Sequence, residues 1–253
     1  MLNYIKSELY RTAHRKYPYI LVGGSSLLCI IANLFVMIYT KDNPAIPITM
    51  WDMLMISTGM FTMIYYIVIL IVDIVFSDEY KHNTLKNTVS FGINRTNIYL
   101  GKFISEMIVA TVSLIIVTIV LILSSYILIG PGEISVAETL KNFGTKLIAV
   151  YPLWLVGLAI ANFLAFNIKS NNIFAFAYLG VVAIFPGIVK MLAYVKPIFT
   201  KLQSILVSNQ IKFISSQEMI IGRDITKSYI LGVIYIVIIT ALGIISFRRK
   251  EIK

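Results

Sequence analysis

Charged residues are missing from long parts of this sequence. Asp, Glu, Lys and Arg together make up 13% of the chain, whereas a soluble domain has about 25%. Apolar residues make up 58% of the chain, and the mean hydropathy is +0.85. This composition excludes a single soluble domain, because one core cannot bury so much apolar surface, and it indicates that the bilayer is the solvent. The longest uncharged runs cover residues 19–39, 53–72, 107–130, 147–168 and 229–247.

The residues that disulfide, metal and nucleotide chemistry require are scarce as well. The single cysteine, Cys29, can form no disulfide within the chain, and the two histidines have no metal-ligand spacing to other ligands. Residues 222–228, GRDITKS, resemble a phosphate-binding loop, but Thr226 stands where the second glycine is required. We therefore predict that the chain is not an enzyme and binds no metal or cofactor itself.

The uncharged runs are long enough to cross a membrane as helices. A spanning helix needs roughly 17–25 apolar residues, and lipid offers no partner to unpaired backbone groups. The sequence therefore predicts an all-α integral membrane protein that forms one transmembrane domain over residues 1–253. Asn33 and Asn162 lie inside spans and are expected to form hydrogen bonds between helices. The six predicted spans cover about residues 19–39, 53–76, 104–130, 147–168, 173–195 and 229–247.

The basic residues predict how the chain is oriented. Residues 1–17 place Leu2, Ile5 and Leu9 at helical steps, which is typical of a helix in the membrane interface, and Pro18 is expected to bend the chain into the first span. Lys and Arg gather in the short connections on the side of the termini, so both termini are predicted to be cytoplasmic. The net charge of +10 then indicates attraction to anionic lipid, not to nucleic acid.

The connection between the fifth and sixth predicted spans is long and partly apolar. Pro186 and Gly187 are expected to interrupt the fifth span near its outer end. Residues 196–227 contain apolar stretches that are too short to cross the bilayer. They are predicted to form short external or half-inserted helices, and an ordinary polar outer loop is the alternative.

A polar insert at residues 77–102 lies between the second and third spans and has helical spacing on both sides of Gly92. We expect a short helix, a glycine turn and a second helix that returns to the membrane. The segments EYKHNTLKN at 79–87, SFGINR at 90–95 and IYLGK at 98–102 resemble the first cytoplasmic loop of ABC-2 type permeases. Asn83 replaces the usual glycine of that pattern, but asparagine tolerates the same left-handed backbone.

The resemblance implies that the insert is a coupling helix resting on a separate ABC ATPase, which alone uses ATP. Two ATPase subunits and two copies of this chain would form the transporter, in the plasma membrane of a bacterium. The resemblance is also to small exporters of peptide toxins and lantibiotics. The residues that it implies for ATPase coupling are Glu79, Thr84, Leu85, Phe91, Gly92 and Arg95.

The spans offer an amphipathic peptide a path that is apolar and contains several adaptable methionines. Candidate path residues on the second span are Met55, Met63 and Tyr66, although packing alone also explains them. The alternatives are export of another hydrophobic substrate, such as a drug or lipid, and a non-transporting immunity or sensor protein. An ion-coupled carrier is disfavoured, because no carboxylate lies near the middle of a span.

Overall fold

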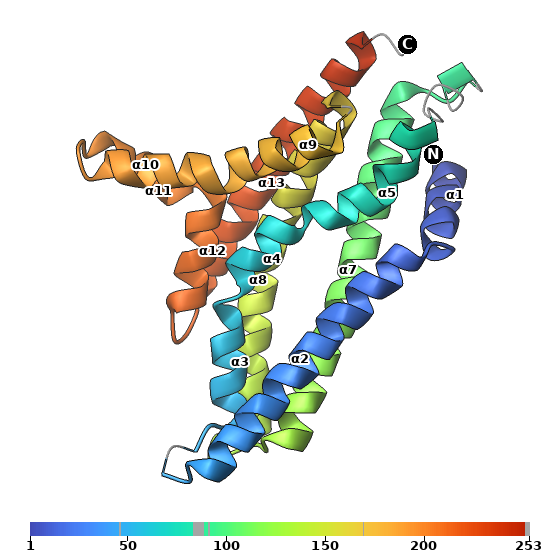
Figure 1. The fold of residues 1–253 in the computed structure, drawn as a ribbon. Helices are drawn as coiled ribbons and strands as arrows, with labels where there is room; N and C mark the ends of the chain where they lie inside the picture. The colour runs from blue at the N-terminus through green and yellow to red at the C-terminus, as the bar shows by residue number, and fades with distance from the viewer. Residues whose placement is uncertain (46, 83–88, 91, 169, 251–253) are drawn as a thin grey trace.

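The computed structural model describes residues 1–45, 47–82, 89–90, 92–168 and 170–250, with the backbone alone for 77–82 and 171. All regular structure in these ranges is helical, which confirms the predicted all-α class (Figure 1). The helices are α1 (Leu2–Ala13), α2 (Lys16–Asp42), α3 (Met50–Thr58), α4 (Phe61–Ile67), α5 (Ile69–His82), α7 (Arg95–Leu128), α8 (Val136–Asn167), α9 (Asn171–Leu179), the π-helix η1 (Gly180–Ile184), α10 (Phe185–Ala193), α11 (Ile198–Ile205), α12 (Val207–Ser216) and α13 (Gly222–Arg249).

Within the described ranges, five helices are long and apolar enough to cross a membrane, and a bent pair makes a sixth candidate. Their outer faces carry large apolar side chains, such as Phe35 on α2 and Ile127 on α7, which are 69% and 73% exposed. Such faces are stable in lipid and would be unfavourable in water. Figure 1 places both termini at the same end of the molecule, near α1 and the end of α5.

Helix α8 is the centre of the bundle. Of its most apolar stretch, 67% is buried, against 6% for the corresponding stretches of α2 and α7. Helix α13 runs along it, and α3, α4, α5, α9 and α12 cover its other sides. The closest approach to α13 is at Gly232, where an added Cβ would lie 2.8 Å from the Cβ of Pro152. A small residue at this crossing lets the two backbones meet.

The predicted second span, residues 53–76, is broken in the structure. Helix α3 and the helix over 61–76 meet at an angle of 46°. Just before the break, the hydroxyls of Ser57 and Thr58 donate to the carbonyls of Leu54 and Met55, each at 2.7 Å. Such bonds compete with the helix ladder and are typical of helix bends. The Thr58 hydroxyl also lies 3.2 Å from the carbonyl oxygen of Ser215, so the bend contacts α12.

The fifth predicted span is continuous, so the expected interruption at Pro186 is wrong. The helix extends from residue 172 to Ala193 and absorbs the proline through the π-helical turn η1. A proline cannot donate to the carbonyl four residues earlier, and a wider turn accommodates this loss. The connection that follows contains α11 and α12, and Ile211 and Ile214 of α12 are fully buried.

The N-terminal region also differs in detail from its prediction. Helix α1 ends at Ala13 and α2 begins at Lys16, so the chain turns before Pro18, which lies in the first turn of α2. Proline is tolerated there because the first backbone N–H groups of a helix have no partner within it. Farther along α2, the amide of Asn33 donates to Ser124 of α7 at 2.6 Å and accepts from Ser125 at 3.2 Å. These bonds between helices agree with the role expected for Asn33.

Tyrosine rings fit against glycines at several helix contacts. Gly157 of α8 faces the rings of Tyr65 and Tyr178, and the Tyr178 hydroxyl donates to the carbonyl of Tyr65 at 2.6 Å. Gly243 of α13 faces Tyr99, which is fully buried on α7. In both places the missing side chain leaves the space that the ring fills.

Replacing Gly243 with alanine should therefore destabilise the fold, because the new methyl group overlaps the Tyr99 hydroxyl and the buried ring cannot move aside. We expect a loss of about 1–3 kcal/mol, as for other overpacked sites. Thermal unfolding of purified protein in detergent measures it. Gly24→Ala in α2 is the matched control, because nothing lies within 4 Å of its added Cβ. Equal unfolding temperatures for the two variants would contradict the packing argument.

Candidate functional site

The connection between α5 and α7 is the candidate site. Of the residues implied in coupling, Glu79 lies in the last part of α5, where the backbone alone is described. Thr84, Leu85 and Phe91 lie outside the described residues. Gly92 has a φ of 81°, a left-handed conformation that suits glycine, and its N–H donates to the carbonyl of Val89 at 3.0 Å.

Arg95, the sixth implied residue, points into the protein. It begins α7, and its guanidinium donates to the carbonyls of Phe247, Arg248 and Lys250 at 3.0, 2.9 and 2.6 Å. The guanidinium also lies 5.9 Å from the centre of the Phe247 ring. The last carbonyls of a helix have no partner within it, and here an arginine of another helix supplies one. Arg95 thus joins the start of α7 to the end of α13.

Further bonds extend this junction to α8. The Lys250 ammonium donates to the carbonyls of Phe166 and Asn167 at 2.7 and 3.1 Å. The hydroxyl of Ser246 donates to the side-chain oxygen of Asn167 at 2.6 Å. The end of α13 is therefore bound to both α7 and the central helix, so the three helix ends form one connected unit.

A buried ion pair lies on the other side of the start of α7. The Lys102 ammonium is 3.1 Å from a carboxylate oxygen of Glu8 on α1, and the same oxygen accepts from Arg11 at 2.6 Å. Lys102 is fully buried and Glu8 is 4% exposed. The ammonium also lies 4.6 Å from the centre of the Phe76 ring on α5, a cation–π distance. Three helices therefore meet around one charged group.

Two arginines of α1 complete the contact with α5. Arg11 donates to the carbonyl of Val75 at 3.4 Å, and Arg15 donates to the carbonyl of Ile74. The side of α1 that packs on the protein thus holds Ile5, Glu8 and Thr12, rather than the whole apolar row expected from the sequence. Leu2 of that row is 65% exposed and is free to face lipid.

This arrangement can transmit a mechanical displacement. The connection is covalently attached to α5 and α7. Charged bonds join α5 and α7 to α1, and α7 to the end of α13, where Lys250 in turn binds α8. Interactions inside a low-dielectric region are stronger than the same interactions in water. A force applied to the connection would therefore move several helix ends together.

Sequence reasoning did not find the Glu8–Lys102 pair. The signal was present, because Glu8 is the one acidic residue among the basic residues of the N-terminal segment. The pattern of α1 alone could not indicate which side of the helix faces α7.

The candidate path residues do not form a single lining. Met55 is half-buried on α3, Met63 is 57% exposed on α4, and the ring of Tyr66 packs 6.0 Å from the ring of Tyr65. Among the described residues, no group of three or more His, Cys, Asp or Glu side chains could hold a metal ion.

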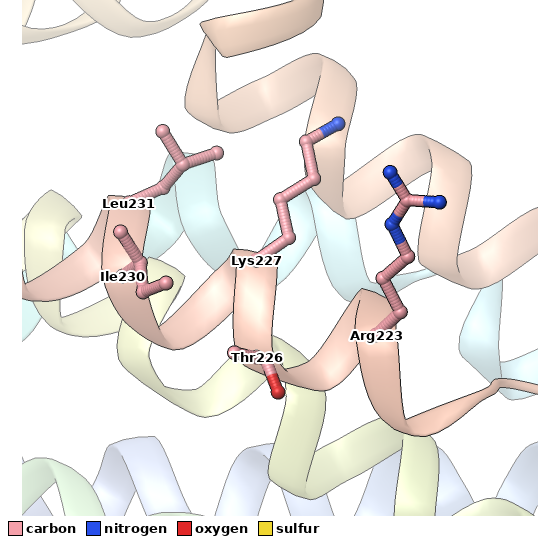
Figure 2. A pocket seen from close by; sticks show the side chains of 5 residues that line it. All are labelled: Arg223, Thr226, Lys227, Ile230 and Leu231. Carbon is pink, nitrogen blue, oxygen red and sulfur yellow. The ribbon is translucent and has the colours of Figure 1, made fainter.

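A shallow hollow of about 430 Å³ lies at the start of α13, at the end of that helix away from the candidate site. Figure 2 shows Arg223 and Lys227 extending in the same direction, with Ile230 and Leu231 one turn farther along. Both basic side chains are exposed. Long basic side chains at the end of an apolar helix are typical of a membrane interface, where the charged heads reach water.

The fold defines a multi-pass membrane protein, and the contacts of Arg95, Lys102 and Lys250 form a polar cluster at one end of the bundle. Comparison with protein-family models matches residues 4–187 to the ABC-2 family transporter protein. The match covers well over half of the chain, so the chain belongs to the ABC-2 family. It is accordingly a membrane component of a transporter, a subunit without catalysis of its own, in a family whose partner is an ABC ATPase. A search of the curated proteins found no match.

The ion pair makes a quantitative expectation possible. Glu8→Ala removes one carboxylate partner from a fully buried ammonium and should destabilise the protein by about 3 kcal/mol. The double variant Glu8→Met, Lys102→Met removes both charges and should recover much of that loss. Thermal unfolding of Glu8→Met, Lys102→Met and the double variant gives the coupling energy. Additive losses would show that the two side chains do not interact in the folded protein.

Proposed function

We propose that the chain is the permease subunit of an ATP-driven exporter of amphipathic peptides. The observation that supports the proposal is the bonded end of the bundle that carries both termini, where the two helices flanking the polar connection are joined to α1 and α13, and α13 to α8. In such a transporter the ABC ATPase undergoes the ATP-driven conformational change and the permease forms the path. The permease therefore needs a surface that contacts the ATPase and transmits this change to its helices. The connection over residues 77–102 is well suited to be that surface.

Coupling would proceed by rigid transfer. ATP-driven closure of two ATPase subunits displaces the connection, and α5 and α7 move with it because it is continuous with both. The Glu8–Lys102 pair carries the displacement to α1, and Arg95 carries it to the end of α13. Helix ends that shift as a unit can change the packing of the bundle, as in other switching transitions. Glu79, Thr84, Leu85 and Phe91 are the proposed contacts with the ATPase.

The exposed surface favours a homodimer. Among the five long spans of the described residues, α8 has 67% of its most apolar stretch buried, whereas α2 and α7 have only 6% buried. One such bundle does not enclose a path, and a second copy packed against it would. We assign α2 and the α9–α10 helix to that face, as the family resemblance implies.

The proposed cargo, an amphipathic peptide, is inferred from the apolar, sulfur-containing and aromatic side chains of the spans. The surfaces of α3 and α4 offer sulfur and aromatic groups, including Met55, Met63 and Tyr66, to an apolar or amphipathic molecule. A drug or lipid has the same apolar character and is the nearest alternative. A sensor or immunity protein without transport is the other alternative, since such a protein would need the spans but no flux of cargo.

A transport assay tests the proposal. Bacterial cells that express the chain with its ABC ATPase should become tolerant to amphipathic peptides. Glu79→Lys should abolish this tolerance while the ATPase still hydrolyses ATP, because a reversed charge disrupts the contact through which motion enters. The control is Glu133→Lys, the same reversal at an exposed residue between α7 and α8.

Three results of that assay would contradict parts of the proposal. Transport by the purified chain without an ATPase would exclude ATP-driven coupling. Extrusion of a sugar or metal ion, with no gain of tolerance to any amphipathic peptide, would exclude the peptide cargo. Equal transport by the Glu79 variant and the control would exclude the proposed entry point for motion.

The same proposal requires both termini in the cytoplasm of a bacterial cell. Cysteines introduced singly at Asn43 and at Ser90, in a Cys29→Ser background, should react differently with an impermeant thiol reagent on intact cells. We expect labelling at position 43 and protection at position 90, because position 43 follows the end of α2 and position 90 precedes the start of α7, and these two helix ends lie at opposite ends of the bundle (Figure 1). Labelling at position 90 from outside would reverse the orientation.

A further inference from the structure

A second polar site lies at the opposite end of the bundle from the coupling connection. It is a pocket of about 530 Å³ between α3, α8 and the segment that follows α12. Its lining includes Trp51 and Met55 of α3, Asn142 and Lys146 of α8, and Glu218. Pockets that bind small ligands have volumes of about 300–1,000 Å³, so this one is large enough.

The unusual feature of the pocket is Lys146. Its side chain is only 2% exposed, yet its one hydrogen-bond contact among the described residues is the sulfur of Met55, at 3.5 Å. A thioether is a weak acceptor, and an ammonium has three donors. Lysine is almost never this deeply buried without a charged partner, because the lost hydration is costly. The pocket is therefore lined by a buried basic side chain that forms no ion pair within the described part of the chain.

Glu218 does not supply that anion. Its carboxylate lines the same pocket and acts electrostatically on Lys146, but it is exposed at the rim, and the two side chains are not among the ion pairs of the described residues. Asn142 donates to the backbone carbonyl of Glu218 at 3.0 Å, which holds the rim segment against α8. The charge inside the pocket is thus positive, and the charge at its mouth is negative.

We propose that this pocket binds a small group that carries an anionic oxygen, a carboxylate or a phosphate, with an apolar part beside it. The anionic oxygen pairs with the Lys146 ammonium at the closed end. The apolar part lies against Met55 and Trp51, and the polar rim closes around it. The binding site is separate from the coupling connection and requires no ATPase, so it can be tested independently of the proposed function.

The test is a binding titration that uses the intrinsic fluorescence of Trp51. The chain has two tryptophans, and a Trp154→Phe background leaves Trp51 alone at the pocket. Hexanoate and hexyl phosphate are the probes, and hexanol is the uncharged control, with purified protein in detergent. We expect a saturable change with both anions and none with hexanol. An equal response to hexanol would overturn the proposal.

Three variants separate the role of Lys146 from a general effect of charge. Lys146→Met should weaken anion binding at least tenfold, and Lys146→Arg should retain it. Lys141→Met, at an exposed lysine of the same helix, is the matched control and should bind as the parent does. Lys146→Met removes a buried charge without losing volume, so it should fold at least as well as the parent. Unchanged binding by a folded Lys146→Met protein would overturn the proposal.

Glu218→Gln should strengthen anion binding, whereas Lys146→Met should weaken it. Loss of the rim carboxylate removes repulsion, so simple anions should bind several-fold more tightly. If Glu218 instead closes on Lys146 as a structural pair, this variant would bind no better and would be less stable, which would also overturn the proposal.

Reconstitution then distinguishes the two sources of the anionic group. The titration is repeated in nanodiscs of phosphatidylcholine alone and with phosphatidylglycerol added. Competition by phosphatidylglycerol that disappears in Lys146→Met assigns the pocket to an anionic lipid headgroup. Binding that does not depend on phosphatidylglycerol assigns it to a soluble carboxylate or phosphate.

Discussion

The burial of α8 is the constraint on which the rest of the structure depends. In lipid, apolar side chains gain little from meeting one another, so helices associate through close packing and interhelical hydrogen bonds. Helix α8 provides for both, with Gly157 accepting two tyrosine rings and Trp154 donating to the carbonyl of Phe61 at 2.9 Å. The other spans use α8 as a common support and turn their remaining apolar faces outward.

The polar interactions of the bundle are arranged differently along its length. Inside the spans they are few and short-ranged, as at Asn33 and the serines of α7. At the end that carries both termini they form connected groups, in which Arg95 of α7 donates to the last carbonyls of α13 and Arg11 of α1 donates to a carbonyl of α5. This contrast suits a machine in which one end receives motion and the remainder repacks in response.

Two buried lysines show how the same residue type serves different purposes. Lys102 is fully buried and has a carboxylate of α1 at 3.1 Å, so its charge joins helices together. Lys146 is buried almost as deeply but has a methionine sulfur as its contact in the described part of the chain. A charge with a protein partner is structural, whereas a charge that faces a pocket is available to a ligand.

The sequence by itself determined the class of the protein. Uncharged, non-alternating runs of about twenty residues indicate helices that cross a membrane, because a helix satisfies its own backbone groups where lipid offers no partner. The family resemblance also came from sequence, through the residues around Gly92. The position of Arg95 was available from sequence, but the helix end that it binds was not.

Only the tertiary structure decided which apolar helix lies inside and what each polar residue touches. Helices α2 and α8 are similarly apolar, yet 6% of one stretch and 67% of the other are buried. Lipid and a packed helix bundle are both apolar, so hydropathy cannot tell one neighbour from the other. The bend after Thr58, the continuous helix at Pro186 and the surroundings of Glu8 and Lys146 depend for the same reason on contacts between segments far apart in the chain.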